Sequence, residues 1–335
     1  MRVLFDHPVP FVLAHGGFQI QIEQTARALH EIGVDVELLR WWDDRQSGDI
    51  IHYFGRPHDL YIAWAQRQGF RVVIADLLTE LGSRNRRARF VQKLTMQIAQ
   101  RVLPGSFQSR LAWGSYRKAD AAIALTAWEG ALLQQMFDVP PEKVRVVPNG
   151  VEEVFLTASA RERTPWLICT ATITERKRVL ELAEAAIVAQ TPVWIVGKPY
   201  SGSDHYGQRF EQLARANPRW IRYEGAIQDR KAMAEAYRSA RGFVLLSTME
   251  SLSLSALEAA ACECPLLLSD LPWARTVFGS NATYCAVTSV SETAKHLRSF
   301  HEAAPTAPRA PKPLTWVQVA EQFRAVYEEL LRTSR

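Results

Sequence analysis

Short apolar runs rich in β-branched residues alternate along this chain with longer segments of helical periodicity, and this alternation limits the fold more than any other feature. The strands expected in the first half are 2–5, 34–40, 49–54, 71–75, 121–125 and 144–147. The helices expected between them are about 19–32, 59–69, 84–103, 107–118 and 128–137. The second half continues with strands at 165–171, 192–197, 220–225, 243–246 and 265–269. Such alternation predicts an α/β fold with doubly wound parallel sheets.

The length of the chain favours more than one domain, because 335 residues exceed what one hydrophobic core usually supports. Residues 303–313 are rich in Pro and Ala and predict a linker. After it, apolar residues recur at helical spacing up to Leu331. We therefore expect domains at 1–160 and 161–312, followed by a last helix within 313–335.

Composition indicates a soluble globular protein, with 47% hydrophobic and 22% charged residues. No apolar run approaches the roughly 20 residues that span a bilayer, and no signal peptide opens the sequence. The four cysteines have irregular spacing that fits neither a disulfide framework nor a zinc site. We interpret Cys262 and Cys264 as core residues and expect a reducing, cytoplasmic location.

A strand, a polar turn and a helix follow one another from Phe243 to Cys262. The backbone amides of Ser253, Leu254 and Ser255 lie where the helix begins, so they would face an anion with the help of roughly half a positive charge from the helix dipole. Glu250 and Glu258 flank this position, and carboxylates there suit hydroxyl donors beside a phosphate. The alternative is an ordinary helix whose acids complement the dipole.

This Glu250-x7-Glu258 unit resembles the donor site of retaining GT-B glycosyltransferases of the family 4 type. The resemblance implies that Glu250 holds hydroxyls of the transferred sugar, that Glu258 holds the nucleotide ribose, and that the amides of 253–255 hold the diphosphate. The family often has Gly and Pro where this chain has Ser251, Ser253 and Ser255.

The turn after the first strand of the second domain carries further resemblance. Lys177 aligns with a family Lys that neutralises the donor diphosphate, but Thr172 stands where the family has Arg. An Arg fork stabilises leaving-group charge, so this departure bears on catalysis. We hypothesise that Arg176 or Arg178 supplies the missing cation, and we take Glu250, Lys177 and Arg176 as the catalytic candidates.

Glycines mark two more donor contacts that the resemblance implies. Gly16 and Gly17 open the first helix, where their lack of a side chain permits close backbone approach to a ligand. Gly225 and Ile227 lie in a turn that resembles the family's nucleobase contact. The turn Pro148-Asn149-Gly150 resembles the segment that closes the family's N-terminal domain.

Three residues of the first domain are candidate sugar or acceptor contacts: Asp76, His52 and His15. Asp76 occupies a strand end where the family usually has His, which leaves the sugar undecided. His52 titrates near neutral pH in its ordinary state, and a purely structural role for it is the alternative.

The segment 84–118 is basic, with nine Lys and Arg and no Asp or Glu in a chain of net charge +5. Phe90, Leu94 and Ile98 form part of an apolar stripe beside the cations. One interpretation is a helix on an anionic membrane surface; the other is a solvated helix packed on its own sheet. The segment lacks a nucleic-acid recognition motif and interleaved aromatics, so we expect no nucleic-acid partner.

As a whole, the resemblance implies two Rossmann-like domains facing a cleft, with the terminal helix crossing back to the first. The first domain would bind a glycan, lipid-linked or other acceptor, such as a cell-envelope polysaccharide, and the second a UDP- or GDP-sugar. Transfer would proceed with retention, with no cofactor and no metal, in the cytoplasm or on the inner face of the membrane. The alternatives are a GT-B-like nucleotide-sugar epimerase, which would turn over donor without acceptor, and a non-catalytic partner protein.

Overall fold

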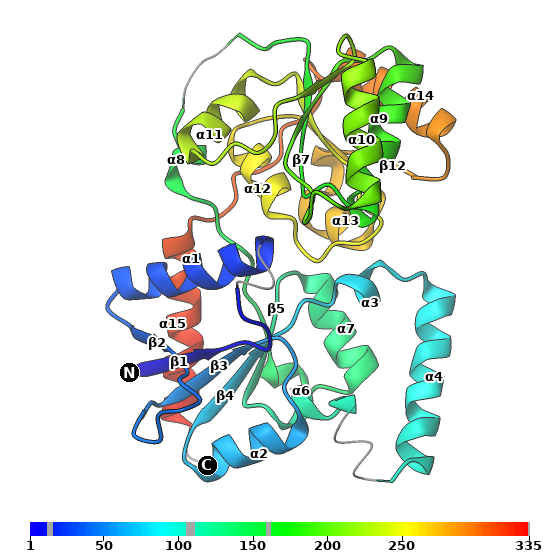
Figure 1. Cartoon of the computed structure of the whole chain (residues 1–335). Helices are drawn as coiled ribbons and strands as arrows, with labels where there is room; N and C mark the ends of the chain where they lie inside the picture. Colours follow the sequence, from blue (N-terminus) through cyan, green and yellow to red (C-terminus); the bar gives the residue numbers. More distant parts are fainter. Residues whose placement is uncertain (12–15, 105–110, 159–161, 334–335) are drawn as a thin grey trace. The chain divides into compact units, whose positions relative to one another are not determined.

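The computed structural model describes residues 1–11, 16–104, 111–158 and 162–333. The chain forms two compact units (Figure 1). The first unit contains Met1–Gly150 together with Trp316–Arg335, and the second contains Val151–Thr315. The division falls at Gly150, earlier than the residue 160 expected from the sequence. Among the described residues, no helix is long and apolar enough to cross a membrane.

The first unit is built on a six-stranded parallel sheet with the order β2-β1-β3-β4-β5-β6. Its strands are β1 (Arg2–Asp6), β2 (Asp35–Leu38), β3 (Ile50–Phe54), β4 (Arg71–Ala75), β5 (Ala121–Ala124) and β6 (Val144–Val146). Its helices are α1 (Gly17–Glu31), α2 (Asp59–Arg67), α3 (Thr79–Ser83), α4 (Arg86–Val102), α6 (Ser115–Lys118), α7 (Ala127–Phe137), a 3-10 turn η1 (Pro141–Lys143) and α15 (Trp316–Arg332).

The two faces of this sheet are covered by different helices, as the period-two alternation of β3 requires. Ile51 belongs to the core cluster that includes Ile62 of α2 and Leu132 of α7. His52 points to the other face, where its ring lies 5.2 Å from that of Phe323 in α15. The helix α15 also packs against α1. The expected return of the terminal helix to the first domain is therefore confirmed.

The second unit has a six-stranded parallel sheet with the order β12-β11-β10-β7-β8-β9. Its strands are β7 (Leu167–Thr170), β8 (Val193–Val196), β9 (Ile221–Tyr223), β10 (Gly242–Leu245), β11 (Leu266–Ser269) and β12 (Thr283–Cys285). Its helices are α8 (Glu153–Leu156), α9 (Val179–Ala189), α10 (His205–Ala216), α11 (Arg230–Ser239), α12 (Leu254–Ala261), α13 (Pro272–Phe278), α14 (Val290–Ala303) and the 3-10 turns η2 (Glu175–Lys177) and η3 (Gly279–Asn281). The doubly wound fold predicted from the sequence is thus confirmed in both units.

Each sheet has one point where the strand order reverses, and such points are where open α/β sheets bind ligands. In the first sheet, the chain leaves β1 toward β2 on one side and β3 toward β4 on the other, so the switch lies between β1 and β3. In the second sheet, whose order is that of a dinucleotide-binding fold, the switch lies between β7 and β10. The loops after β7 and β10 are therefore the candidate ligand-binding loops of the second unit.

Candidate functional site

The loops that follow β7 and β10 are bound to each other through their backbones. The amide of Thr248 donates a hydrogen bond to the carbonyl of Arg176 at 2.9 Å. The Arg176 guanidinium in turn donates to the carbonyl of Met249, also at 2.9 Å. These contacts fix the turn η2 against the segment that leads into α12, so the charged side chains of both loops are held together.

A carboxylate with two cations occupies this switch point. Lys177 Nζ donates to Glu250 Oε1, and Arg176 Nη1 lies 3.3 Å from the same oxygen. The side chains of Glu250 and Lys177 are only 10% and 13% exposed, whereas that of Arg176 is 38% exposed. A carboxylate this buried needs charged or hydrogen-bonding partners. The three catalytic candidates from the sequence therefore lie in one cluster.

The N-terminus of α12 begins four residues after Glu250 and adds a further anion-binding feature. Ser253 caps the helix, its hydroxyl accepting from the amide of Ala256 at 3.3 Å. The amides of Leu254 and Ser255 belong to the first turn, where no preceding turn supplies carbonyl acceptors. Together with the helix dipole, they make this end of α12 attractive to a phosphate.

Glu258, one turn into α12, is held by a network of polar side chains. Arg230 of α11 donates to Glu258 Oε1 and also to Glu152 at 2.7 Å. The hydroxyl of Tyr237 donates to Glu258 Oε2 at 3.1 Å and lies 2.6 Å from the hydroxyl of Thr170. Burial raises the pKa of Glu258 above its ordinary value, and the adjacent Arg230 partly counteracts this. The network orients the carboxylate that the resemblance assigns to ribose.

Sequence reasoning did not identify Arg230, Tyr237 or Glu152. No short motif contains them, because Arg230 and Tyr237 are seven residues apart on α11 and Glu152 precedes α8, far from both in sequence. The one local signal is Asp229, whose carboxylate caps α11 by accepting from two amides and so fixes where Arg230 begins the helix. That signal predicts a helix start, not a partner for Glu258.

Gly197, at the end of β8, allows a third loop to approach the site. Its φ is +154°, and a Cβ at this position would lie 1.9 Å from the carbonyl oxygen of Ala171. The amide of Ile173 donates to the carbonyl of Lys198 across the same contact, at 3.1 Å. Only glycine permits this close approach. The contact packs the loop after β8 against the loop that carries η2.

The two residues assigned to the nucleobase lie at the end of β9. Gly225 has a φ of +85°, and its carbonyl accepts from the amide of Gly197 at 3.0 Å. A cavity of about 580 Å³ lies along the edge strand β9 and α10, lined among others by Trp166, Arg215 and Gly225. Ile227 and Glu258 do not line it. This cavity is therefore separate from the charged cluster at the switch point.

Of the two arginines considered in place of the family's Arg at position 172, the geometry favours Arg176. Arg176 lies beside Glu250, as described above. The Nε of Arg178 is buried and makes no hydrogen bond within the described part of the chain, and Arg178 itself has a left-handed φ of 53°. Thr172 is partly buried in the loop after β7.

The glycine turn of the first unit lies at the carboxyl end of β1. Gly16 is the N-cap of α1 with φ 132° and ψ −152°, a conformation that favours glycine. A Cβ there would meet no atom within 4 Å, so the constraint is conformational. Gly17 is the first residue of α1. His15 lies outside the described residues.

His52 differs from the expectation that it contacts sugar or acceptor, because it is fully buried in the core beneath α15. Its Nδ1 lies 2.6 Å from the hydroxyl of Tyr327, and its ring stacks on that of Phe54 at 4.3 Å. Burial lowers the pKa of His52 to about 3, so the imidazole is neutral. The structural role left open in the sequence analysis is the one that this geometry favours.

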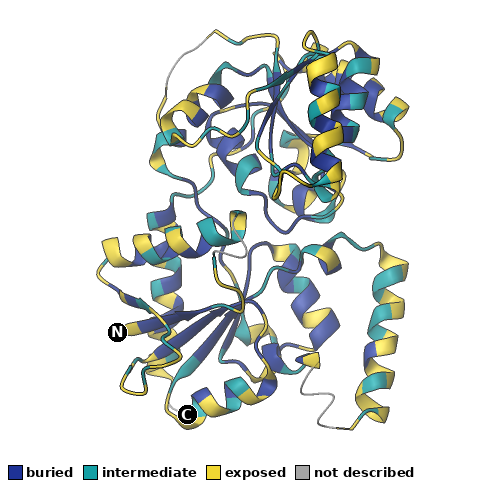
Figure 2. Ribbon diagram, viewed as in Figure 1, coloured by how far each residue is buried: buried dark blue, intermediate teal, exposed yellow. Residues whose placement is uncertain are grey.

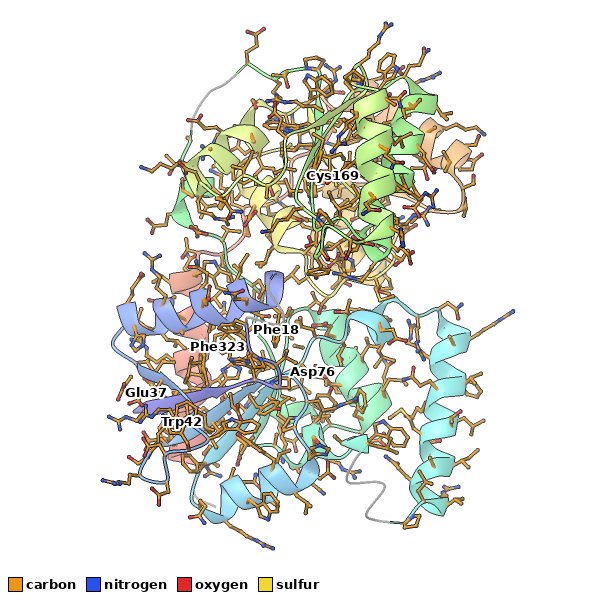
Figure 3. All side chains as sticks on the ribbon, viewed as in Figure 1. Phe18, Glu37, Trp42, Asp76, Cys169 and Phe323 are labelled. Carbon is orange, nitrogen blue, oxygen red and sulfur yellow. The ribbon has the colours of Figure 1, made fainter. Side chains whose placement is uncertain are left out.

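Asp76, which is labelled in Figure 3, follows β4 and accepts a hydrogen bond from the hydroxyl of Tyr116. Burial and the charge of Asp76 raise the pKa of Tyr116 well above its ordinary value. A second carboxylate, Asp6 at the end of β1, accepts from Tyr61 at 2.6 Å. The carboxyl edge of the first sheet thus carries acids that hold tyrosine hydroxyls.

In the described ranges, no three His, Cys, Asp or Glu side chains gather as the ligands of a metal ion would. The four cysteines are all buried and unpaired.

Residues 164–302 match the family model described as glycosyl transferases group 1. Residues 36–150 match the model described as glycosyl transferase 4-like domain. The two matches fall in the second and the first unit, respectively. No curated protein sequence matches the chain.

Several solved structures share the fold. A sucrose-phosphate synthase from Thermosynechococcus elongatus has a TM-score of 0.71 at 18% identity, with 100% of both chains covered. The Anabaena protein Alr3699/HepE, solved in complex with UDP and glucose, has a TM-score of 0.68 at 13% identity over 98% of this chain and 99% of its own. A lipopolysaccharide outer core galactosyltransferase, WaaB, has a TM-score of 0.62 at 14% identity over 98% and 100%. At these identities the likeness concerns the fold alone.

Proposed function

Because the chain belongs to the GT-B glycosyltransferases of the family 4 type, we propose that it transfers a sugar from a UDP- or GDP-sugar to a glycan or lipid-linked acceptor with retention and without a metal ion. The observation that carries this proposal is the cluster of Glu250, Lys177 and Arg176 next to the N-terminus of α12. It combines a carboxylate for sugar hydroxyls with cations and amides for a diphosphate.

Each group in the second unit has a chemical role in this proposal. The donor diphosphate binds the amides of Leu254 and Ser255 and the cations Lys177 and Arg176, which displaces part of the ion pairing to Glu250. The carboxylate of Glu250 then accepts from hydroxyls of the transferred sugar, and Glu258 accepts from the ribose. Preorganised donors of this kind stabilise the charge that develops on the leaving diphosphate.

The transfer step uses groups of the two substrates. The bond between the anomeric carbon and the diphosphate oxygen breaks, and a bond from the acceptor oxygen forms on the same face. The acceptor proton passes to the departing phosphate oxygen, so that nucleoside diphosphate is released. Arg176 supplies the second cation for that leaving group, in the role that Thr172 cannot fill.

We assign the acceptor to the first unit, where Asp76 follows the carboxyl end of β4. A cell-envelope polysaccharide or its lipid-linked precursor, reached from the cytoplasm at the inner face of the membrane, is the acceptor that we propose. Among the structural relatives, Alr3699/HepE was solved with UDP and glucose, and WaaB is described as a galactosyltransferase. UDP-hexoses are accordingly the first donors to test.

The test is donor binding followed by turnover. A ligand that binds only the native state raises the melting temperature by mass action, so one of UDP-, GDP-, ADP- or dTDP-sugars should stabilise the protein. Glu258→Gln should lose this shift, while Glu263→Gln, an exposed glutamate just beyond the same helix, should keep it. Proton NMR of the product reports the anomeric configuration, and activity should persist in EDTA.

The same experiment separates the alternatives. Donor turnover in the absence of any acceptor would identify a nucleotide-sugar epimerase. A protein that no nucleotide sugar stabilises would contradict the enzymatic proposal and would support a non-catalytic partner. An inverted product would contradict the same-face mechanism while leaving the donor site intact.

A further inference from the structure

Helix α4 exposes most of its large apolar side chains. Only Met96 is buried among its 17 residues, and Figure 2 shows the helix as mainly exposed and intermediate in burial. The exposed fractions of its apolar side chains are 71% for Phe90, 60% for Val91, 48% for Leu94, 53% for Ile98 and 75% for Val102. An isolated exposed apolar residue is ordinary, but five on one helix indicate an interaction surface.

The five exposed side chains form one stripe that faces away from the protein. At about 100° per residue, they occupy an arc of about 120°, and Met96 lies on the opposite side of the helix. The ordinary arrangement of an amphipathic helix on a globular protein is the reverse, with the apolar stripe toward the core. The apolar stripe of α4 is therefore exposed and can contact a binding partner outside the first unit.

Polar contacts hold the inward face of α4 instead. The guanidinium of Arg89 lies 4.6 Å from the ring centre of Trp128 in α7. Lys93 donates to the carbonyl of Gln135 and lies 3.6 Å from a carboxylate oxygen of Asp138. These cations anchor the helix to α7, so the stripe is presented in a defined direction.

Exposed cations at the two ends of the stripe indicate its partner. Arg86, Arg87 and Arg101 are all exposed on α4, and the whole segment 84–118 contains no acid. Two copies of this stripe would bring like charges together, which disfavours self-association. An exposed apolar stripe with cations at its two ends, whose long side chains can reach lipid phosphates, suits a helix that lies in the headgroup region of a bilayer.

We propose that α4 docks the protein on an anionic lipid surface, with Phe90, Leu94 and Ile98 in the acyl boundary and the arginines on lipid phosphates. Docking through α4 would place the first unit at the surface where a lipid-linked acceptor lies. In this respect the inference rests on the proposed function and extends it. The docking itself depends on α4 alone and is measurable without any transfer reaction.

The test is sedimentation of the full chain with vesicles of phosphatidylcholine alone or mixed with phosphatidylglycerol. The wild type should bind the mixed vesicles, and added salt should weaken binding. Leu94→Gln combined with Ile98→Gln should lower the partition coefficient by at least about tenfold, since both positions lose buried apolar area. Replacing Arg86, Arg87 and Arg101 by Gln should lower it roughly 100-fold, at about fivefold for each cation.

A matched control removes the same number of exposed apolar side chains elsewhere. Leu60 in α2 and Val188 in α9 are 52% and 57% exposed, and Leu60→Gln with Val188→Gln should leave vesicle binding unchanged. The wild type remaining in the supernatant with anionic vesicles would overturn the proposal. So would equal binding by the variant with Leu94 and Ile98 replaced.

A second measurement tests whether a second copy of the chain, in place of a lipid surface, covers the stripe. If light scattering shows a wild-type dimer that Leu94→Gln with Ile98→Gln dissociates, and vesicles are not bound, a second copy covers α4 and the lipid proposal is wrong. Donor thermal shift measured on the same variant separates the two proposals. An unchanged shift shows that the donor site is intact whatever the vesicle result.

Discussion

Replacing Arg230 by Met tests whether the network around Glu258 holds the donor-binding carboxylate. The substitution keeps an unbranched side chain but removes the charge that pairs with both Glu258 and Glu152. Breaking a buried ion pair by deleting one partner costs roughly 3 to 5 kcal/mol. Because the side chain of Arg230 is 35% exposed and that of Glu258 is 10% exposed, water screens part of the interaction. We therefore expect a loss of about 2 kcal/mol in the free energy of unfolding at neutral pH.

The pH dependence of that loss identifies Glu258 as the group left without its partner. Burial raises the pKa of Glu258, so the folded state binds this proton more readily than the unfolded chain does. The contribution to stability is thus fully present below the unfolded pKa, about 4.3, and is lost as pH rises through the folded value. Removing Arg230 raises the folded pKa further. The difference between variant and wild type should therefore shrink as the pH falls from 7 toward about 5.

Urea unfolding of wild type and variant at several pH values measures this difference. Arg215→Met is the control, since its pair with Glu211 lies in the same unit and the arginine side chain is 78% exposed; the expected cost there is at most about 0.5 kcal/mol at every pH. A double-mutant cycle with Glu258→Gln should show coupling, because the neutral amide no longer needs the cation. A pH-independent loss, or additive effects in the cycle, would refute the reasoning.

Three further predictions test other parts of the structure. Lys177→Met should lower kcat by roughly 10²- to 10³-fold with a smaller change in donor KM, whereas Arg178→Met should lower it much less; equal losses would mean that Arg178 also reaches the diphosphate. Gly197→Ala should destabilise the protein by about 3 kcal/mol or more, because its Cβ would collide with a backbone carbonyl at a φ of +154°; a melting temperature within error of wild type would contradict the close loop contact. Burial of His52 depresses its pKa to about 3, so its contribution to stability is present above about pH 6.5 and is lost toward pH 3 at about 1.4 kcal/mol per unit. The pair His52→Leu with Tyr327→Phe should flatten the wild-type decline in unfolding free energy between pH 6.5 and 4.5, and an unchanged slope would show that other groups cause it.

Elements and their order could be predicted because their signals are local. The strands β3 and β10 are mostly apolar and buried along their whole length, as is typical of strands in a parallel sheet. The Glu250 to Glu258 spacing lies within one turn and one helix, so sequence alone brings these residues to a single helix start. Lys177 follows the neighbouring strand in the sheet, and its position beside Glu250 follows from the parallel order at the switch point.

The rest of the site could not be read from the chain because it depends on contacts between elements far apart in sequence. Arg230 meets Glu258 and Glu152 only when α11 is packed beside α8 and α12, and nothing in its neighbours specifies that packing. His52 shows the converse, since a histidine is a common ligand contact, but α15, which begins more than 250 residues later, covers its face of β3. Periodicity places a side chain on one face of an element but does not state what covers that face. The same argument applies to α4, whose apolar stripe would ordinarily be assigned to the core. Its exposure therefore carries information that the sequence pattern alone does not contain.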